Sequence, residues 1–141
     1  MPPENSQPGR PEDWLRRAGS DLALAEVGRK PGVLLEELCF HTQQAAEKAI
    51  KAVLISRGSS PGRTHNIGIL LELMPEDIEV PEGVRRAAIL TDYAVSTRYP
   101  GIYEPIEVRE YREAIRLAGV VVEWAATLIR KPPPSGDSDL D

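Results

Sequence analysis

Apolar residues recur at steps of three and four in several windows between the prolines, which is the spacing of an α-helix. The first pattern begins at Pro11, with acidic residues in the first turn, and ends near Gly28. The second runs from Leu35 to Val53 and is apolar over much of its circumference, so we expect a central helix there. Gly58 follows at the place where a helix C-terminus favours glycine.

Three further windows complete the pattern. The spacing predicts a short helix over 67–74, with Thr64 or Asn66 as its N-cap, and a regular fifth helix over 108–129. Between them, the apolar positions from Val84 to Ala94 predict a fourth helix that ends before Tyr99-Pro100-Gly101, because a residue before proline is disfavoured in a helix. No window shows sustained alternation of apolar and polar residues, which would indicate strands. We therefore predict an all-α fold, an up-and-down antiparallel bundle of four long helices plus one short helix.

Length and composition indicate a single domain. The chain has 141 residues, of which 41% are hydrophobic, and this is enough for one core. We expect a disordered N-terminal tail over 1–11, one domain over 12–131 and a disordered, acidic, proline-rich tail over 132–141. The chain has neither a membrane-spanning apolar run nor the pattern of a signal peptide, so a cytoplasmic location is expected.

Charge and cysteine content exclude further classes. The net charge of −5 comes from the two tails, since residues 14–131 contain basic and acidic residues in equal numbers. A protein that binds double-stranded DNA needs a basic face, so that class is not expected. Cys39 is the only cysteine, which rules out an intrachain disulfide and disfavours a structural zinc site, and we expect neither a metal nor a cofactor.

The second predicted helix has a polar stripe. His41, Gln44, Lys48 and Lys51 follow one another at steps of three, four and three, so they share one face. For His41 and Gln44, one alternative is a functional site, and the other is a polar group whose hydrogen bonds are satisfied in the core or at an interface. For Lys51 we favour a solvated position.

Two other polar groups are candidates for an anion site. Arg63 and His65 precede the short helix, where free backbone N–H groups also favour an anion, and a simple capping loop is the alternative. Arg98 and Tyr99 follow the fourth helix, with Tyr93 one to two turns earlier. Arginine can pair with a phosphate while tyrosine stacks on a base, although Tyr-Pro-Gly is also a good turn sequence.

Together, four segments resemble the HEPN family, the "higher eukaryote and prokaryote nucleotide-binding" domain. They are Asp21-Leu22, CFHTQQAAEKAIKAVLISRG at 39–58, RTHNIGILL at 63–71 and LTDYAVSTRYPG at 90–101. The resemblance covers about residues 13–128 and implies the same helical bundle, similar to the substrate-binding domain of kanamycin nucleotidyltransferase. For small prokaryotic members it implies a homodimer and a minimal nucleotidyltransferase as partner, as in toxin-antitoxin pairs.

Many HEPN proteins are metal-independent ribonucleases that use an arginine followed, after four to six residues, by a histidine. This chain departs from that motif. Seven residues separate Arg57 from His65, one residue separates Arg63 from His65, and no histidine follows Arg98. We therefore expect a binding module rather than an enzyme.

The leading hypothesis is a HEPN module that binds a nucleotide or a nucleotide-bearing substrate and acts with a nucleotidyltransferase. The expected phosphate-binding and stacking residues are Arg63, His65, Arg98, Tyr99 and Lys48. One alternative is a ribonuclease toxin in which His65 and Arg98 form a catalytic site across a dimer. The other is a purely structural dimeric interaction protein, in which case His41, Gln44 and Lys48 satisfy each other.

Overall fold

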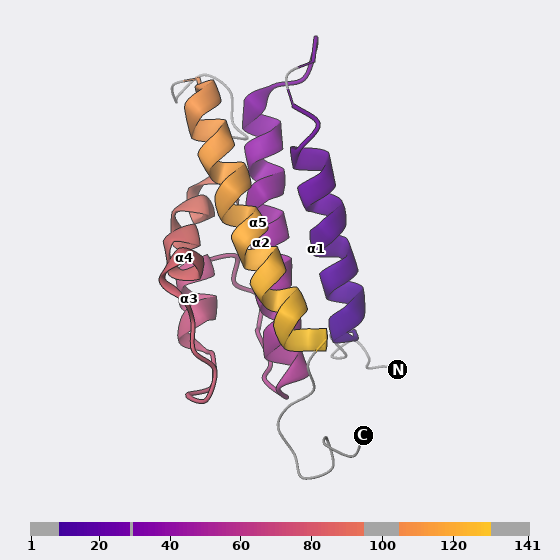
Figure 1. The fold of residues 1–141 in the computed structure, drawn as a ribbon, viewed down its shortest axis with the longest axis vertical. Helices are drawn as coiled ribbons and strands as arrows, with labels where there is room; N and C mark the ends of the chain where they lie inside the picture. The colour runs from indigo at the N-terminus through magenta and orange to yellow at the C-terminus, as the bar shows by residue number, and fades with distance from the viewer. Residues whose placement is uncertain (1–8, 29, 95–104, 131–141) are drawn as a thin grey trace.

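The computed structural model describes residues 9–28, 30–94 and 105–130, and within them the chain forms helices and no strands (Figure 1). The all-α prediction is confirmed. In chain order, the elements are α1 (Pro11–Ala25), α2 (Leu35–Ser56), α3 (Ile67–Glu72), α4 (Glu82–Arg85), the 3-10 helix η2 (Arg86–Ala94) and α5 (Val108–Arg130). Among these described helices, none is both long and apolar enough to cross a bilayer.

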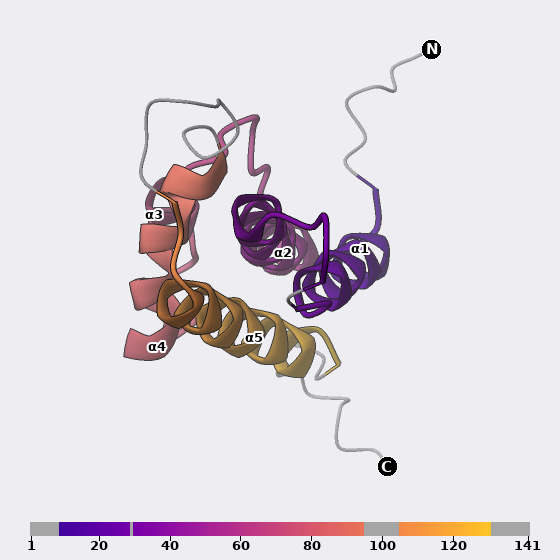
Figure 2. The same ribbon diagram turned by 90° about the horizontal axis from the view of Figure 1, so that it is seen from above.

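Helix α2 lies at the centre of the bundle. Figure 2 shows α1 on one side of α2 and the α3 and α4 region on the other, while α5 packs along α2 between them. In Figure 1, α1 and α2 run in opposite directions, and so do the α4–η2 segment and α5. The predicted up-and-down arrangement is therefore confirmed, and the helix expected to be central, α2, contacts α1, α3, η2 and α5.

The C-terminal end of α2 and the N-terminal end of α3 form where the sequence places them, whereas α3 ends at Glu72, two residues earlier than predicted. The Gly58 N–H donates to the Ile55 carbonyl at 3.0 Å and the Ser59 N–H to the Leu54 carbonyl at 2.9 Å, a paired closure that needs the positive φ of 81° at Gly58. Of the two candidate caps for α3, Asn66 is the N-cap, since its side-chain oxygen accepts from the Ile69 N–H at 3.0 Å.

The fourth helix differs from a regular α-helix. Only α4 has α-helical hydrogen bonding, and the chain continues as a 3-10 helix through η2. The buried residues there are Val84, Ala87 and Leu90, at strict steps of three. A 3-10 helix has three residues per turn, so this spacing places all three side chains in one row against the core. The predicted end of this helix, before Tyr-Pro-Gly, lies outside the described residues.

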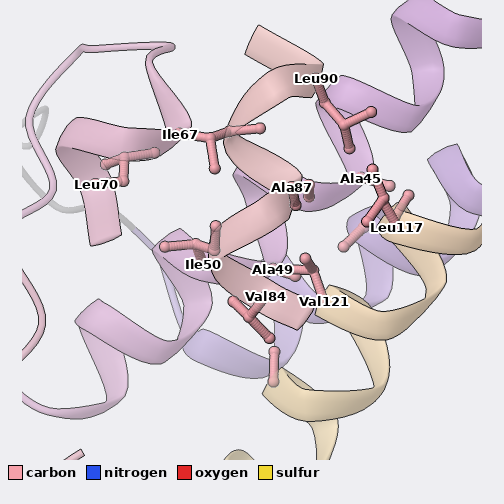
Figure 3. Packing of buried hydrophobic residues seen from close by; sticks show 14 of the residues in the cluster. Ala45, Ala49, Ile50, Ile67, Leu70, Val84, Ala87, Leu90, Leu117 and Val121 are labelled. Carbon is pink, nitrogen blue, oxygen red and sulfur yellow. The ribbon is translucent and has the colours of Figure 1, made fainter. Parts of the chain in front are cut away.

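Alanines and branched aliphatic residues build the core. Ala45, Ala49 and Ile50 of α2 are completely buried and lie against residues of η2 and α5, including Leu90 and Leu117 (Figure 3). Small side chains at these positions let the helices approach closely, and the larger aliphatic residues fill the remaining space. The tight packing around α2 leaves little room for a side chain of different size.

Replacing Ile50 with alanine is expected to lower the free energy of unfolding by about 2 to 5 kcal/mol, because a fully buried branched side chain leaves a cavity. The matched control is Ile89→Ala, since Ile89 is 64% exposed on η2, and it is expected to change stability by less than about 0.5 kcal/mol. Urea unfolding measures both. Equal losses in the two variants would contradict the placement of Ile50 in the core.

Candidate functional site

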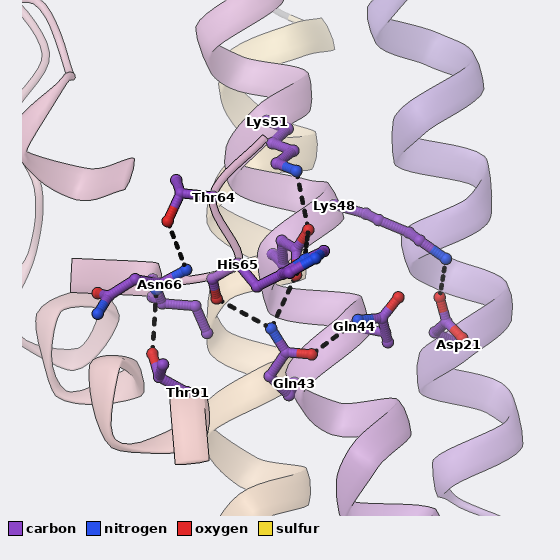
Figure 4. A network of polar contacts seen from close by, with 11 residues as sticks. Asp21, Gln43, Gln44, Lys48, Lys51, Thr64, His65, Asn66 and Thr91 are labelled. Atoms are coloured by element: carbon purple, nitrogen blue, oxygen red, sulfur yellow. Dashed lines mark hydrogen bonds and ion pairs between the residues drawn. The ribbon is translucent and has the colours of Figure 1, made fainter. Parts of the chain in front are cut away.

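Three polar side chains lie buried on one face of α2. Gln43, Glu47 and Lys51 are 0%, 4% and 6% exposed. Their spacing of four residues stacks them along the helix. Gln43 and Glu47 contact His65 in the chain that leads into α3, and Lys51 lies over Trp14 of α1. Figure 4 shows Gln43 pointing toward His65. A buried charge is stable only when it is paired and hydrogen-bonded, so the partners of these groups determine what the site can do.

The Glu47 carboxylate is the centre of this cluster. Lys51 Nζ donates to one oxygen at 2.8 Å, Gln43 Nε2 donates to the other at 2.8 Å, and His65 Nδ1 lies 3.0 and 3.1 Å from the two oxygens. Burial alone would raise the pKa of Glu47, but the hydrogen bonds from Lys51, Gln43 and His65 outweigh it and hold the pKa below its usual value. Glu47 is therefore an ionised carboxylate inside the protein.

This carboxylate determines the state of His65. An ionised carboxylate only accepts hydrogen bonds, so His65 Nδ1 carries a proton and donates it toward Glu47. The backbone of His65 is also held in place, because Gln43 Nε2 donates a hydrogen bond to the His65 carbonyl at 3.2 Å. The imidazole is 65% exposed, and its Nε2 forms no hydrogen bond with any described residue. His65 thus presents one oriented, accessible ring nitrogen to the surface.

A second buried carboxylate joins α1 to α2. Asp21 of α1 is 7% exposed, and its two oxygens lie 2.9 Å from His41 Nδ1 and 2.7 Å from Lys48 Nζ. Gln44 belongs to the Glu47 cluster, since its Nε2 donates to Gln43 Oε1 at 2.8 Å. The polar stripe of α2 is therefore divided between two groups, since His41 and Lys48 pair with Asp21 of α1, and Gln44 and Lys51 belong to the Glu47 cluster.

The structure corrects one expectation about this stripe. The sequence favours a solvated position for Lys51, whereas its side chain is buried, the residue being 6% exposed, and is paired with Glu47. The sequence pattern also did not single out Glu47 or Asp21 as members of the site. The available signal was the spacing Gln43, Glu47, Lys51, which places two charges next to the apolar surface of the central helix.

The other residues predicted to belong to the site lie outside the Glu47 and Asp21 groups. Arg63 is exposed, two residues before His65. The Tyr93 hydroxyl donates to Glu110 Oε2 at 2.5 Å, and burial together with this hydrogen bond raises the pKa of Tyr93. Arg98 and Tyr99 lie outside the described residues.

Neither the cysteine nor the acidic residues form a metal site in the described part of the chain. No group of three or more histidine, cysteine, aspartate or glutamate side chains is arranged to hold a metal ion there. Burial, followed by the nearby charge of Glu110, raises the pKa of the Cys39 thiol to about 12. Cys39 is therefore a neutral thiol in the core and a poor ligand or nucleophile.

Comparisons with a family model and with solved structures both find similarity to HEPN proteins. The family model of the HEPN domain matches residues 11–129. The solved structure of TT1696 from Thermus thermophilus is 34% identical, with a TM-score of 0.76, over 84% of this chain and 98% of that one. ST0689, described as an archaeal HEPN homologue, is 31% identical, with a TM-score of 0.68, over 86% of this chain and 98% of that one. No curated protein matches the chain.

Replacing Glu47 with glutamine is expected to destabilise the protein by about 3 kcal/mol, because the amide has one acceptor oxygen for three donors and leaves the buried Lys51 ammonium uncompensated. The matched control is Glu113→Gln, which removes an exposed ion pair with Arg116 on α5 and is expected to have little effect. Urea unfolding at neutral pH compares the two variants.

The pH dependence of stability provides a second test of the contribution of the Glu47 charge. The folded-state pKa of Glu47 is below its usual 4.5, so its stabilising contribution is present above that pH and is lost as the pH falls through the folded-state pKa. Wild type should therefore lose more stability on acidification than Glu47→Gln. Parallel acid profiles of the two proteins would show that the Glu47 charge does not stabilise the fold.

Proposed function

Because this chain belongs to the HEPN family, we propose that it binds a nucleotide, or the nucleotide part of a larger substrate, at the surface around His65. The observation that carries the proposal is the exposed imidazole held in one orientation by the buried Glu47 carboxylate. A folded protein that keeps a buried charge beneath an exposed histidine has oriented that ring before any ligand arrives. Such preorganisation reduces the entropy lost on binding.

The chemistry around His65 suits a phosphate group. When the ring is protonated, Nε2 donates a charge-assisted hydrogen bond, and the exposed guanidinium of Arg63 can add a bidentate contact. Arg63 forms no ion pair with another described residue, so no such contact must break before it binds an anion. In this proposal Lys48 adds a positive charge for the phosphate while it keeps its ion pair with Asp21. In this proposal Arg98 supplies a further cation, and Tyr99 stacks on the base.

We further propose that the module works as a homodimer with a minimal nucleotidyltransferase in the cytoplasm, as one member of a toxin-antitoxin-like pair. Exposed apolar residues near the turn between α1 and α2 support a protein partner, since Leu24 is 47% exposed and Leu34 is 61% exposed. Clustered apolar side chains at a surface commonly mark interaction sites. In this arrangement the module presents the substrate, and the nucleotidyltransferase supplies the chemistry.

One observation favours a second candidate function, a metal-independent ribonuclease. A buried carboxylate that orients an exposed histidine is the usual arrangement of a general base, and Glu47 with His65 has this form. His65 would remove the proton from the ribose 2′-hydroxyl, and Arg98 would stabilise the charge that develops on the phosphate. The surface around His65 serves both candidates, so only an assay of activity separates them.

Nucleotide binding is tested by calorimetry with ATP and GTP. His65→Ala and Arg98→Ala are each expected to weaken binding about ten-fold or more, because a charged hydrogen bond contributes roughly 1.5 to 3 kcal/mol. Arg85→Ala is the control, since Arg85 is exposed on α4, on the other side of α2 from α1. The absence of binding by wild type, both alone and with its nucleotidyltransferase partner, would refute the proposal.

Ribonuclease activity is tested by incubating the protein with RNA in EDTA. If the second candidate is correct, wild type cleaves the RNA and His65→Ala does not, because the general base is gone. Glu47→Gln should reduce cleavage as well, and His41→Ala, which alters the other carboxylate–histidine pair, should not. Intact RNA after incubation with wild type would remove this candidate.

A further inference from the structure

A hollow of about 450 Å³ opens beside the first half of α1, next to α2. This volume lies within the range of about 300 to 1,000 Å³ that is typical of small-molecule sites. Its lining residues combine an aromatic ring with three cationic side chains and a single carboxylate, and they are Gly9, Asp13, Trp14, Arg16, Arg17 and Lys48.

The aromatic wall of the hollow is held in place from two directions. Gly9 has a positive φ of 93°, and a Cβ at this position would lie 3.3 Å from the indole nitrogen of Trp14, so the backbone packs closely against the ring. Lys51 Nζ lies 5.7 Å from the centre of the indole, within range of a cation–π contact. Lys51 is the residue that pairs with Glu47, so the Glu47 network also positions this wall.

The charged wall favours an anion. Arg17 is exposed and forms no ion pair within the part of the chain that the structure describes. Lys48 is 26% exposed at its side chain and reaches from α2 toward α1, where it shares Asp21 with His41 (Figure 4). Arg16 and Asp13 form only a long, exposed contact of 3.8 Å. The hollow thus offers at least one guanidinium and one ammonium group at its surface.

We propose that this hollow binds the base and the adjacent phosphate of a nucleotide, with the base against Trp14 and the phosphate between Arg17 and Lys48. The inference rests on the proposed nucleotide-binding function and deepens it by assigning the contact with the base to Trp14 in place of Tyr99. Lys48, which the sequence predicts to be a phosphate-binding residue, lines this hollow. An aromatic ring beside cations is the combination that binds bases without requiring a particular sequence.

Indole fluorescence tests the contact with the base directly. Excitation at the red edge of the indole band, where adenine does not absorb, reports only on Trp14 and Trp124, and Trp124 does not line the hollow. Titration with ATP is expected to quench the emission of wild type and of Trp124→Phe, and to leave the emission of Trp14→Phe unchanged. Inorganic triphosphate, which has no base, is expected to cause no quenching in any of the three proteins.

Calorimetry with Arg17→Ala tests the phosphate contact in a variant whose exposed substitution leaves the core intact. The affinity for ATP is expected to fall about ten-fold or more, while Arg85→Ala keeps the affinity of wild type. If ATP binds to wild type but neither Trp14 quenching nor dependence on Arg17 is observed, the hollow is not the base subsite and nucleotide binding around His65 stands. If ATP does not bind to wild type at all, both proposals fail.

Discussion

The hydrogen bonds to the Glu47 carboxylate connect three elements of the bundle. Through Lys51 the carboxylate holds the ammonium group that lies over Trp14 of α1, and through His65 it holds the chain that enters α3. Because these donors share one pair of oxygens, the loss of any partner leaves others buried without a full set of hydrogen bonds. The orientation of the exposed imidazole and the position of the indole therefore depend on the same buried charge.

The two sides of the central helix α2 are buried in different ways. One side of α2 must exclude water and pack closely, which alanines such as Ala45 and Ala49 allow. The other side carries charged groups that water would normally solvate, and here donors and acceptors from α1 and from the loop before α3 replace that water. These hydrogen bonds and ion pairs offset the cost of burying charged groups, so α2 can be buried on nearly all sides.

Helix positions and caps could be predicted because they depend on neighbours in the sequence. Asn66 at the start of α3 and Gly58 after α2 act within one turn of the chain. The burial of Lys51 could not be predicted, since periodicity identifies residues that share a face without identifying what covers that face. Glu47 with Lys51 is a short-range helical ion pair, and so is Glu113 with Arg116, yet one pair is buried and the other is exposed. Only the packing of α1 and the loop before α3 distinguishes them.

The 3-10 geometry of η2 also changes how far a given length of chain extends. At about 2.0 Å per residue, a nine-residue 3-10 helix spans roughly 18 Å, whereas an α-helix would need about twelve residues to cover that distance. The η2 segment therefore covers a given length of the bundle with fewer residues than the neighbouring α-helices need. The hydrogen bonds of a 3-10 helix have poorer geometry than those of an α-helix. The burial of Val84, Ala87 and Leu90 against the core therefore stabilises this segment.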